Sequence, residues 1–409
     1  MSDGGVDIYG GVDTHRDVHV AAVVDAVGRV VGSESFAADE SGYRRMVAWF
    51  EGRGALVRVG VEGCGSYGAG LARYLAAADI EVVEVNRPNR QLRRQRGGKS
   101  DPVDAEGAAR AAASGQARAV PKSGDGPVEC LRMLLVARRS AAKARTQAAN
   151  QIHSLVVTAP EQVKHQLRGL GLRARVRTCG RWRPGQAQTT AAYAKKALRH
   201  LARRYQALDA EVDELDVEIR RLCSEANPAL LAAPGVGPDT ASVLLVAAGD
   251  NPNRMKSERS FAALCGASPV QASSGQIVRH RLNQGGNRQA NSALWRIATT
   301  RMRTDAATKH YVERHRAEGK KKREIIRCLK RHIAREIYRL ITNPPPTPNC
   351  ARLRSRRQHA GITISQAAQA LGTHTARISE LELGRNHNHQ LATRYQRWLH
   401  THEATPPPI

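Results

Sequence analysis

The 409-residue chain is long enough for two or three domains, and 64 Lys and Arg against 37 Asp and Glu give it a formal charge of +27. This excess predicts a polyanionic partner, with nucleic acid favoured, and the 4% aromatic content argues against recognition built mainly on base stacking. No apolar run approaches the ~20 residues of a membrane span. The seven scattered cysteines contain no CxxC pair, so neither a zinc module nor a disulfide framework is indicated. The N-terminus "MSDGGVDIYGG" lacks a signal peptide, so we expect a cytoplasmic protein.

Short apolar runs alternate with turns in the first 120 residues. The order β-β-β-α-β-α-β-α predicts a strand meander followed by right-handed crossovers, and therefore a mixed sheet covered by helices. The expected strands are "IYGGVD", "VHVAAVV", "RVVGSESF", "LVRVGVE" and "IEVVEV", and the expected helices are "GYRRMVAWFEG", "GAGLARYLAAA" and one that opens at Asp101.

The rest of the chain is predicted to be mainly helical. Residues 127–157 are helical and basic, a Gly/Arg-rich interruption covers residues 168–186, and a charged helix follows over residues 189–224. Apolar residues three and four apart make the second helix amphipathic or coiled-coil, so the two helices should form an antiparallel hairpin for interactions. Residues 301–339 hold 14 Lys and Arg against 5 Asp and Glu, which favours a nucleic-acid face over a merely solvated one.

These patterns predict an α/β plus α protein. The expected domains are an α/β domain at 1–120, a helical or coiled-coil interaction region at 127–225, a mainly helical domain at 227–342, a Pro-rich linker at 343–349 and a small helical domain at 350–400.

Four carboxylates stand at special places in this layout. Asp13 ends the first strand and Glu62 the fourth, so parallel pairing of these strands would bring both side chains to one edge of the sheet. The helix at "KSDPVDAEGAAR" would add Asp101 and Asp104. Converging carboxylates are what two-metal phosphodiester chemistry needs, with Mg²⁺ or Mn²⁺ as the cofactor. The alternative is local: Asp101 as an N-cap and Asp104 at N3 of a capping box.

The order of these acids resembles the ribonuclease-H-like, and in particular the RuvC-like, nucleases. Longer stretches, "GVDTHRDVHVAAVVD", "VGVEGCGSYGAGLARYL", "VNRPNRQLRRQRGGKSDPVDAEGAARAA", "APGVGPDTASVLLVAAGD" and "ALCGASPVQASSGQIVRHRLNQGGNRQANSALW", resemble in order the DEDD transposases of insertion sequence family one hundred and ten. These recombinases are guided by a bridge RNA encoded in their own element. The resemblance covers roughly residues 7–340.

The resemblance implies a set of functional residues. It makes Asp13, Glu62, Asp101 and Asp104 the catalytic metal ligands, and it makes a serine of "QASSGQIVRHRLNQGGNR" a nucleophile: Ser274, with its neighbour Ser273 left open. It also implies DNA partners (element ends and target), the noncoding bridge RNA, and a homo-oligomer, because strand exchange joins two duplexes. A dimer or tetramer is expected, with the apolar stripe of residues 205–222 on a partner helix.

Basic and turn residues provide candidate nucleic-acid contacts. The segment "RPNRQLRRQRGGK" is assigned to the nucleic acid backbone, and arginines near the serine could offset phosphate charge. "PGVGP" resembles a helix-hairpin-helix turn that holds a phosphate, with a plain helix connection equally open. The expected arginine and lysine contacts are Arg87, Arg90, Arg93, Arg94, Arg96, Lys99, Arg279, Arg281 and Arg288.

The C-terminal stretch "LRSRRQHAGITISQAAQALGTHTARISELELGR" resembles a phage-repressor helix-turn-helix, an addition that most members of the transposase family lack. Ser365 should start one helix and Gly372 should make the turn. The second helix would then present residues to base edges or phosphates, while the alternative is a small domain that contacts only protein. The candidate contacts are Thr373, His374, Thr375 and Arg377.

The favoured function is a transposase that excises and integrates its own element through a serine–phosphodiester intermediate, working at the nucleoid. A metal-dependent Holliday-junction resolvase is the closest rival and would use the acids without Ser274. A noncatalytic DNA-binding regulator is the other rival, and it leaves the four ordered acids unexplained.

Overall fold

The structure, a computed structural model, describes residues 6–85, 100–186, 188–271, 280–281, 283, 285–346, 350, 352–384 and 389–403. The chain forms two compact units, Met1–Glu129 with Ala247–Asn287, and Cys130–Val246 with Arg288–Ile409. This division cuts across the predicted domain at 227–342. It follows from contacts near Asp250, whose carboxylate accepts a hydrogen bond from the Val128 N–H at 2.7 Å. Along the described parts of the chain, no helix has both the length and the hydrophobicity needed to cross a membrane.

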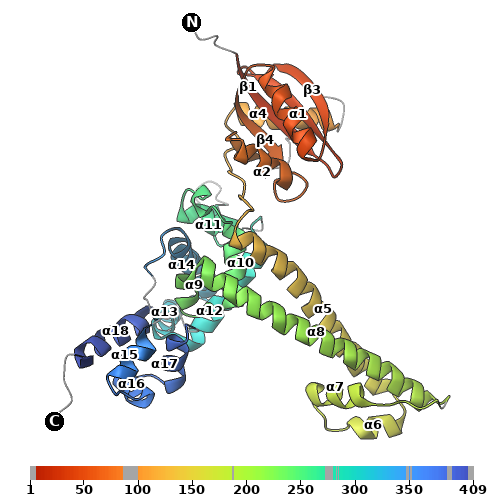
Figure 1. Cartoon of the computed structure of the whole chain (residues 1–409), viewed down its shortest axis with the longest axis vertical. Helices are drawn as coiled ribbons and strands as arrows, with labels where there is room; N and C mark the ends of the chain where they lie inside the picture. The colour runs from red at the N-terminus through yellow and green to blue at the C-terminus, as the bar shows by residue number, and fades with distance from the viewer. Residues whose placement is uncertain are drawn as a thin grey trace. The chain divides into compact units, whose positions relative to one another are not determined.

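The N-terminal sheet has five strands in the order β3-β2-β1-β4-β5 (Figure 1). Neighbours in the β1–β2–β3 meander are antiparallel, whereas β4 runs parallel to β1 and β5 runs parallel to β4. The strands are β1 Asp7–Thr14, β2 Val18–Asp25, β3 Val30–Ala37, β4 Ala55–Glu62 and β5 Val82–Val85. The predicted order of elements and the predicted mixed sheet are both confirmed.

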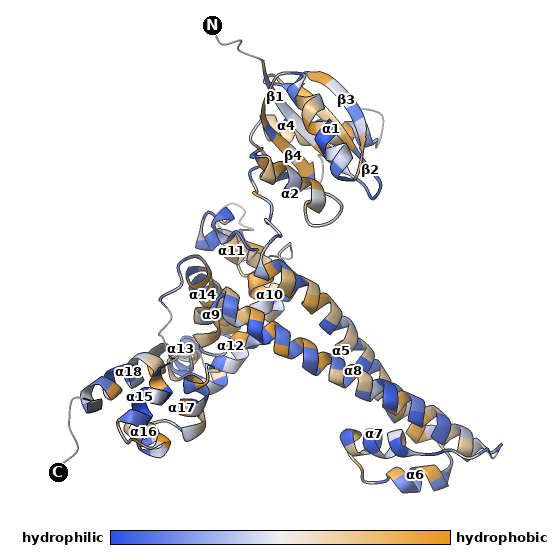
Figure 2. Cartoon of the chain, in the orientation of Figure 1, coloured by the Kyte–Doolittle hydropathy of each residue, from blue (hydrophilic) through white to orange (hydrophobic). Residues whose placement is uncertain are grey.

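Helices cover both faces of this sheet. Helices α1 (Glu40–Glu51) and α2 (Ala69–Ala77) pack on one face around Val12, Phe50 and Val59, which are fully buried. Helix α4 (Asp101–Ala113) lies on the other face, where its alanines contact β1, β2 and β4. In Figure 2, hydrophobic residues are prominent in the strands and alternate with hydrophilic residues in helix α1, which packs on them.

Glycine lets α4 come unusually close to the sheet. A Cβ atom on Gly11 would overlap backbone atoms of Ala105 and Ala109, and one on Gly60 would lie 2.6 Å from the Ala108 carbonyl oxygen. Only glycine leaves room for the helix backbone there. Because Gly11 and Asp13 are two residues apart in β1, they face the same helix. The N-terminal turn of α4 is thereby held beside the end of β1.

The second unit begins with a long helical hairpin made by α5 (Pro127–Thr158) and α8 (Thr190–Ala226). Ion pairs Arg138–Asp216 and Arg145–Asp209 join the two helices, and the opposite order of the partners makes the helices antiparallel. The hairpin prediction is confirmed. Within the 205–222 stripe, Val212, Ile219 and Leu222 are buried in the chain itself, whereas Val217 is 65% exposed. The predicted contact of this stripe with a partner helix stays a prediction.

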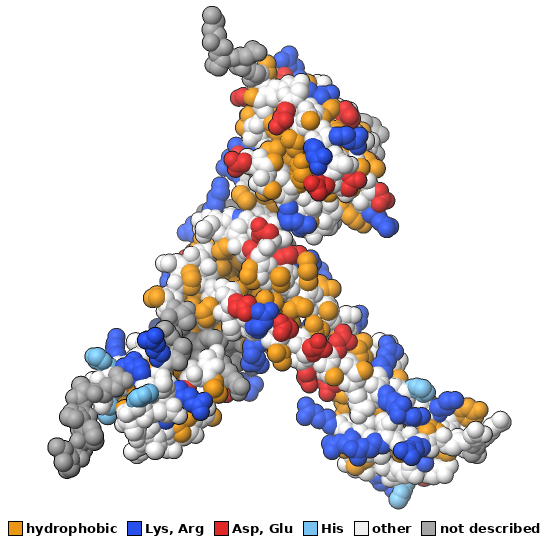
Figure 3. Space-filling view, in the orientation of Figure 1, with side chains coloured by type: hydrophobic (Ala, Val, Ile, Leu, Met, Phe, Trp, Pro, Cys, Tyr) orange, Lys and Arg blue, Asp and Glu red, His pale blue; other side chains and the backbone are white. Residues whose placement is uncertain are grey.

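The predicted interruption at residues 168–186 contains a helix, α7 (Leu172–Arg181), and a second short helix, α6 (Glu161–Leu167), lies just before it. Both pack on α8. Periodicity does not predict helices here, because Gly169 and Gly171 flank the short segments and the apolar residues are few. In Figure 3, Lys and Arg side chains gather over this part of the hairpin.

The remaining elements are short helices and a small hairpin of strands. Arg301 and Glu336 form a bidentate ion pair of 2.6 and 2.9 Å, which joins α12 to α14. The elements are α9 Pro228–Ala232, α10 Pro238–Ala248, η1 Pro252–Arg254, α11 Glu258–Leu264, β6 Val270–Gln271, β7 His280–Arg281, α12 Arg288–Thr304, α13 Ala306–Ala317 and α14 Lys322–Thr342.

The C-terminal helices pack around their own core, in which Ile378, Tyr395 and Leu399 are fully buried. Helix α16 begins at Ile364, one residue before the predicted Ser365, because Thr363 provides the N-cap of a capping box. Gly372 has φ +61°, as the predicted turn requires. The helices are α15 Leu353–His359, α16 Ile364–Ala370, α17 Thr375–Glu382 and α18 His389–Glu403.

Candidate metal centre

The ends of β1 and β4 form one edge of the N-terminal sheet. Val12 lies beside Val61 in the parallel register, so the following residues, Asp13 and Glu62, stand next to each other at about the 4.8 Å separation of neighbouring strands. The Thr14 hydroxyl donates a hydrogen bond of 2.8 Å to the Glu62 carbonyl and ties the two strand ends together. Asp13 and Glu62 therefore share an edge, and by strand alternation they share the face covered by α4.

Helix α4 brings two more carboxylates to this edge. Its N-cap is Ser100, which makes no side-chain capping bond, and Asp101 is the first helical residue. The capping-box alternative is therefore wrong: Asp104 occupies the fourth helical position instead of the third, and its residue is only 1% exposed. A carboxylate buried to this degree is not an exposed helix-start residue, so a capping role does not explain Asp104.

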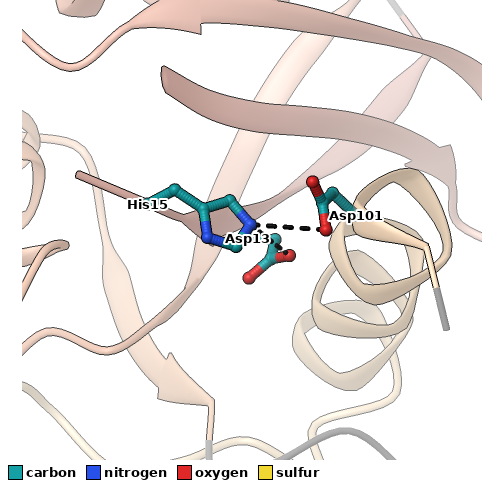
Figure 4. Close-up of side chains that lie close together, drawn as sticks. All are labelled: Asp13, His15 and Asp101. Atoms are coloured by element: carbon teal, nitrogen blue, oxygen red, sulfur yellow. Dashed lines mark ion pairs between the residues drawn. The ribbon is translucent and has the colours of Figure 1, made fainter. Parts of the chain in front are cut away.

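A histidine without a predicted role lies between two of the acids (Figure 4). The Nε2 atom of His15 is 3.3 Å from Asp13 Oδ2 and 3.4 Å from Asp101 Oδ1. The "THRD" turn conceals it in the sequence, because polar residues after a strand are typical of turns. One sequence signal could have indicated His15: it lies two residues after Asp13, and residues two apart in a strand point to the same side of the sheet.

His15 is positioned by a second, buried histidine. The His15 backbone N–H donates to Nδ1 of His19 at 3.3 Å. His19 is fully buried in β2, and its ring stacks on Tyr43 at 5.7 Å between ring centres. Burial lowers the pKa of His19 below the usual value for histidine, which keeps its ring neutral and its Nδ1 available as an acceptor. The turn that carries His15 is therefore anchored to the opposite face of the sheet.

The geometry suits a small divalent cation. Among the described residues, Asp13, His15 and Asp101 each offer a ligand atom, and these atoms all lie within 4.8 Å of one another. Opposite ligands of one Mg²⁺ are about 4.2 Å apart, since each lies about 2.1 Å from the ion. The donors therefore need only small movements to bind one cation. Glu62 and Asp104 are not part of this group of three, although both lie at the same edge.

A nearby thiol does not add to the donor set. Cys64 follows Glu62 by two residues and is buried, and its Sγ donates to the Val61 carbonyl at 3.4 Å. Burial, with a smaller effect from Glu84, raises the pKa of Cys64 to about 12. A thiol that stays protonated at neutral pH is a poor ligand and a poor nucleophile.

Many of the predicted nucleic-acid and nucleophile residues lie outside the described part of the chain. These are Arg87, Arg90, Arg93, Arg94, Arg96, Lys99, Ser273, Ser274 and Arg279. Arg281 is in β7, and Arg288 is exposed at the start of α12. Among the candidate contacts of the C-terminal helices, Thr373 is half-buried, whereas the others are exposed: His374, Thr375 and Arg377.

The predicted phosphate-binding turn "PGVGP" connects α9 to α10. Gly235 has φ +70°, and the Gly237 N–H donates to the Thr240 hydroxyl at 3.1 Å. The Pro234 carbonyl accepts a hydrogen bond of 2.6 Å from Arg301 of α12. One amide of the turn is thus already used within the chain, and the turn is held against α12.

Two family models match the chain in the order of its domains. Residues 10–159 match a DEDD model of the IS110 type described as a transposase, and residues 227–313 match a model described as the Transposase IS116/IS110/IS902 family. The first range contains Asp13, Glu62, Asp101 and Asp104, and the second contains Ser274.

Curated relatives agree with these matches. The chain is 33% identical over 136 residues to an insertion element IS110 uncharacterized protein of Streptomyces coelicolor, an alignment that covers 33% of this chain and 32% of that protein. It is 26% identical over 161 residues to an insertion element IS900 uncharacterized protein of Mycobacterium paratuberculosis, covering 39% of each. The aligned regions thus span only 32% and 39% of the lengths of these relatives. Over the two segments matched by the family models, the chain is therefore similar to transposases of the IS110 type of insertion element.

Proposed function

We propose that the chain excises and integrates its own insertion element by cutting and rejoining DNA at the carboxylate edge of the N-terminal sheet. The observation that carries this proposal is the convergence of Asp13 and Asp101 from different elements on His15, at 3.3 and 3.4 Å. A regulator that only binds DNA has no need to hold α4 so close to the sheet that Gly11 tolerates no side chain.

In this proposal Asp13, Glu62, Asp101 and Asp104 hold Mg²⁺ or Mn²⁺. A divalent cation there supplies Lewis-acid polarisation of the scissile phosphate. The protein contributes the fixed frame: β1 and β4 fix two carboxylates, and the first turn of α4 fixes two more. The buried position of Asp104, 1% exposed, keeps the inner part of the site away from solvent. The exposed side of Asp101 leaves room for the phosphate backbone.

The metal site is tested with Asp101→Asn, which replaces one carboxylate oxygen by an amide of the same size. We expect this variant to have no cleavage activity on an element-end duplex, with unchanged thermal unfolding. The matched control is Asp17→Asn, since Asp17 is exposed on the turn between β1 and β2 and its carboxylate pairs only with Arg16 within the described part of the chain. Cleavage that survives Asp101→Asn would overturn the proposed site.

The second part of the proposal is the serine nucleophile. The Ser274 hydroxyl attacks phosphorus, its proton passes to a base, and the displaced DNA hydroxyl leaves as a phosphoserine bond forms. A hydroxyl of another strand then attacks that bond and restores the serine, so the strands are exchanged without an external energy source. The family match over residues 227–313, which includes Ser274, supports this step. Ser274 itself lies outside the residues that the structure describes.

Mass spectrometry of a trapped reaction tests this step. An adduct on the peptide that contains Ser274, absent in Ser274→Ala, supports the serine mechanism. An adduct on Ser273 would move the assignment by one residue. Cleavage that needs the acids but leaves no adduct would make water the nucleophile and the resolvase the correct function.

The proposal includes a bridge RNA, DNA at the element ends and target, and a dimer or tetramer that works at the nucleoid. The basic segment 87–99 is the proposed backbone contact, and Thr373, Thr375 and Arg377 are proposed to contact DNA as part of a helix-turn-helix. Sequencing of RNA that copurifies with the protein tests the guide directly. Recovery of only abundant cellular RNA, without a transcript of the element, would contradict guidance.

A further inference from the structure

The outer end of the α5–α8 hairpin is a small packed body in its own right. We call residues 160–204 the hairpin tip; it contains α6, α7 and the first part of α8. Val163, Leu167 and Val176 are buried in a core shared with α8 and with Ile152 of α5. Gly180 allows α7 to pack close to Gln206, since a Cβ there would lie 2.9 Å from the Gln206 Oε1 atom. The surface of the tip is therefore held by a defined core.

This surface is strongly and uniformly positive. Residues 160–204 contain 12 Lys and Arg and a single acid, Glu161. The adjoining stretch, residues 205–225, has the opposite balance, with two arginines and seven acids. Figure 3 shows the same division along the hairpin, with blue side chains over α6 and α7 and red ones further along α8. The charge thus changes sign along one continuous helix.

The arginines of α7 are arranged on one side of the helix. Arg173, Arg177 and Arg181 follow one another at intervals of four residues and are exposed, while Val176 and Cys179 are buried on another side. A spacing of four residues advances about 6 Å along a helix, which is close to the ~7 Å between successive phosphates of one strand. These side chains can therefore follow a phosphate backbone.

Few of these cations are used inside the chain. Glu161 pairs with Arg168 at 2.6 Å, and Lys195 lies 5.6 Å above the Trp182 ring. Within the described part of the chain, Arg173, Arg177 and Arg181 form no ion pair. So many like charges on a small body repel one another, and a bound polyanion would relieve that repulsion.

We propose that the hairpin tip binds the phosphate backbone of duplex DNA without reading its sequence. Unpaired strands are bound by successive bases that stack on several exposed aromatic rings. The described residues of the tip offer one such ring, Tyr193 at 58% exposed, while Trp182 is half-buried beneath Lys195. A duplex is therefore the fitting partner. The choice of DNA over duplex RNA rests on the proposed function, in which the substrate is duplex DNA on both sides of the cut.

Two double variants test the proposal with equal reductions in charge. The tip variant is Arg173→Gln with Arg177→Gln, and the control is Arg220→Gln with Arg221→Gln in the acidic part of α8, where Arg221 already pairs with Glu218 and Glu225. Both are made in the full-length Asp101→Asn protein, so that the DNA stays intact. Fluorescence anisotropy of a labelled DNA duplex of about 30 base pairs gives Kd between about 50 and 300 mM salt.

We expect the tip variant to lower the salt slope by about 2, because each of the two arginines neutralises one phosphate, and to weaken binding roughly 10- to 60-fold near 0.1 M salt. The control variant should leave both values within error. Equal effects of the two variants would show that only net charge matters and would overturn the proposal. So would a reduction in affinity that is confined to an RNA duplex of the same length.

Folding and the proposed function are followed separately. Far-UV circular dichroism and thermal unfolding must match the parent protein, and Arg173→Lys with Arg177→Lys should restore binding because it restores the charge. Cleavage is measured with the same substitutions in the wild-type background. A chain that binds DNA through the tip yet never cleaves it would disprove the transposase function while leaving the tip proposal intact.

Discussion

The carboxylate edge and the hairpin tip use charge in opposite ways. At the edge, Asp13 and Asp104 are buried, and glycine contacts beneath α4 fix where they stand. On the tip, arginines are exposed on a thin core, and their number and spacing matter more than the exact position of each. A site for chemistry needs fixed atoms, whereas binding a phosphate backbone needs only enough mobile positive charge. Substitutions that disturb packing should therefore damage the edge far more than the tip.

The sharpest contrast is between two glycines. Gly11→Ala places a Cβ against the backbone of α4, so we expect a destabilisation of about 4 kcal/mol and the disappearance of all cleavage. Gly171→Ala, just before α7, meets no atom within 4 Å at its Cβ, so we expect less than about 0.5 kcal/mol and unchanged DNA binding. Hydrogen exchange of peptides from β1 and α7 measures the change in stability caused by each substitution. Similar effects at the two glycines would show that close packing of α4 does not distinguish the edge.

The C-terminal helices contain a single buried ion pair, so they test how burial alone makes one charge important for stability. Arg357 donates to both carboxylate oxygens of Glu382, at 2.7 and 3.1 Å, and the Tyr395 hydroxyl donates to one of them at 2.6 Å. The Glu382 side chain is only 3% exposed. We expect Glu382→Gln to destabilise this group of helices by about 3 kcal/mol, because it leaves the Arg357 charge buried without a counter-ion.

The same pair predicts an acid-sensitive domain. Burial alone would raise the pKa of Glu382, but hydrogen bonds from Arg357 and Tyr395 outweigh it and leave the pKa below its usual value. Because the pKa of Glu382 is lowered on folding, this stabilisation is complete at pH values above the pKa of the unfolded state, about 4.3. It disappears as the pH falls through the lower pKa of the folded state. Thermal unfolding of wild type and Glu382→Gln from pH 7 to pH 3 measures it, and the difference between them should shrink toward pH 3. A difference that stays constant with pH would contradict the assignment to Glu382.

A smaller effect is expected from His15. If its Nε2 atom is a ligand together with Asp13 and Asp101, His15→Ala should weaken Mn²⁺ binding by about 10- to 100-fold, with little change in folding. Isothermal titration with Mn²⁺ and Mg²⁺ in the absence of DNA gives the affinities, and His359→Ala, an exposed histidine of α15, is the control. Tighter binding in His15→Ala would mean that His15 competes with the cation as a counter-ion between the two carboxylates.

The sheet and its acidic edge are predictable from sequence because both depend on short-range patterns. Alternation in β1 and β4 fixes which side chains share a face, and parallel pairing places Asp13 beside Glu62. The N-cap of α4 differs from the capping-box alternative by one residue, since Ser100 occupies that position without a capping bond that a sequence motif would reveal. The place of His15 is not predictable in this way, because it depends on Asp101, which is distant in sequence.

The hairpin shows the opposite limit. Its two long helices follow from their periodicity, but α6 and α7 are short and gain stability from packing on α8 rather than from their own sequence. Periodicity identifies residues 205–222 as an apolar stripe but does not identify the helix that covers it. It therefore cannot distinguish a helix of the same chain from a helix of another protomer. The grouping of Ala247–Asn287 with the N-terminal unit depends on long-range hydrogen bonds such as that of Asp250 with Val128.

The smallest expected effect concerns the single acid of the tip. Glu161→Gln breaks the exposed ion pair with Arg168, in which the side chains are 68% and 70% exposed, so stability should change by less than about 0.5 kcal/mol. DNA affinity should instead rise about two- to fivefold, because a repelling charge is removed and Arg168 is released toward the phosphates. Glu218→Gln in the acidic part of α8 is the control and should leave affinity unchanged, since Arg221 keeps its contact with Glu225 at 2.6 Å. Anisotropy at about 0.1 M salt resolves the difference. Unchanged affinity in Glu161→Gln would place the DNA elsewhere and remove the contrast between the tip and the edge.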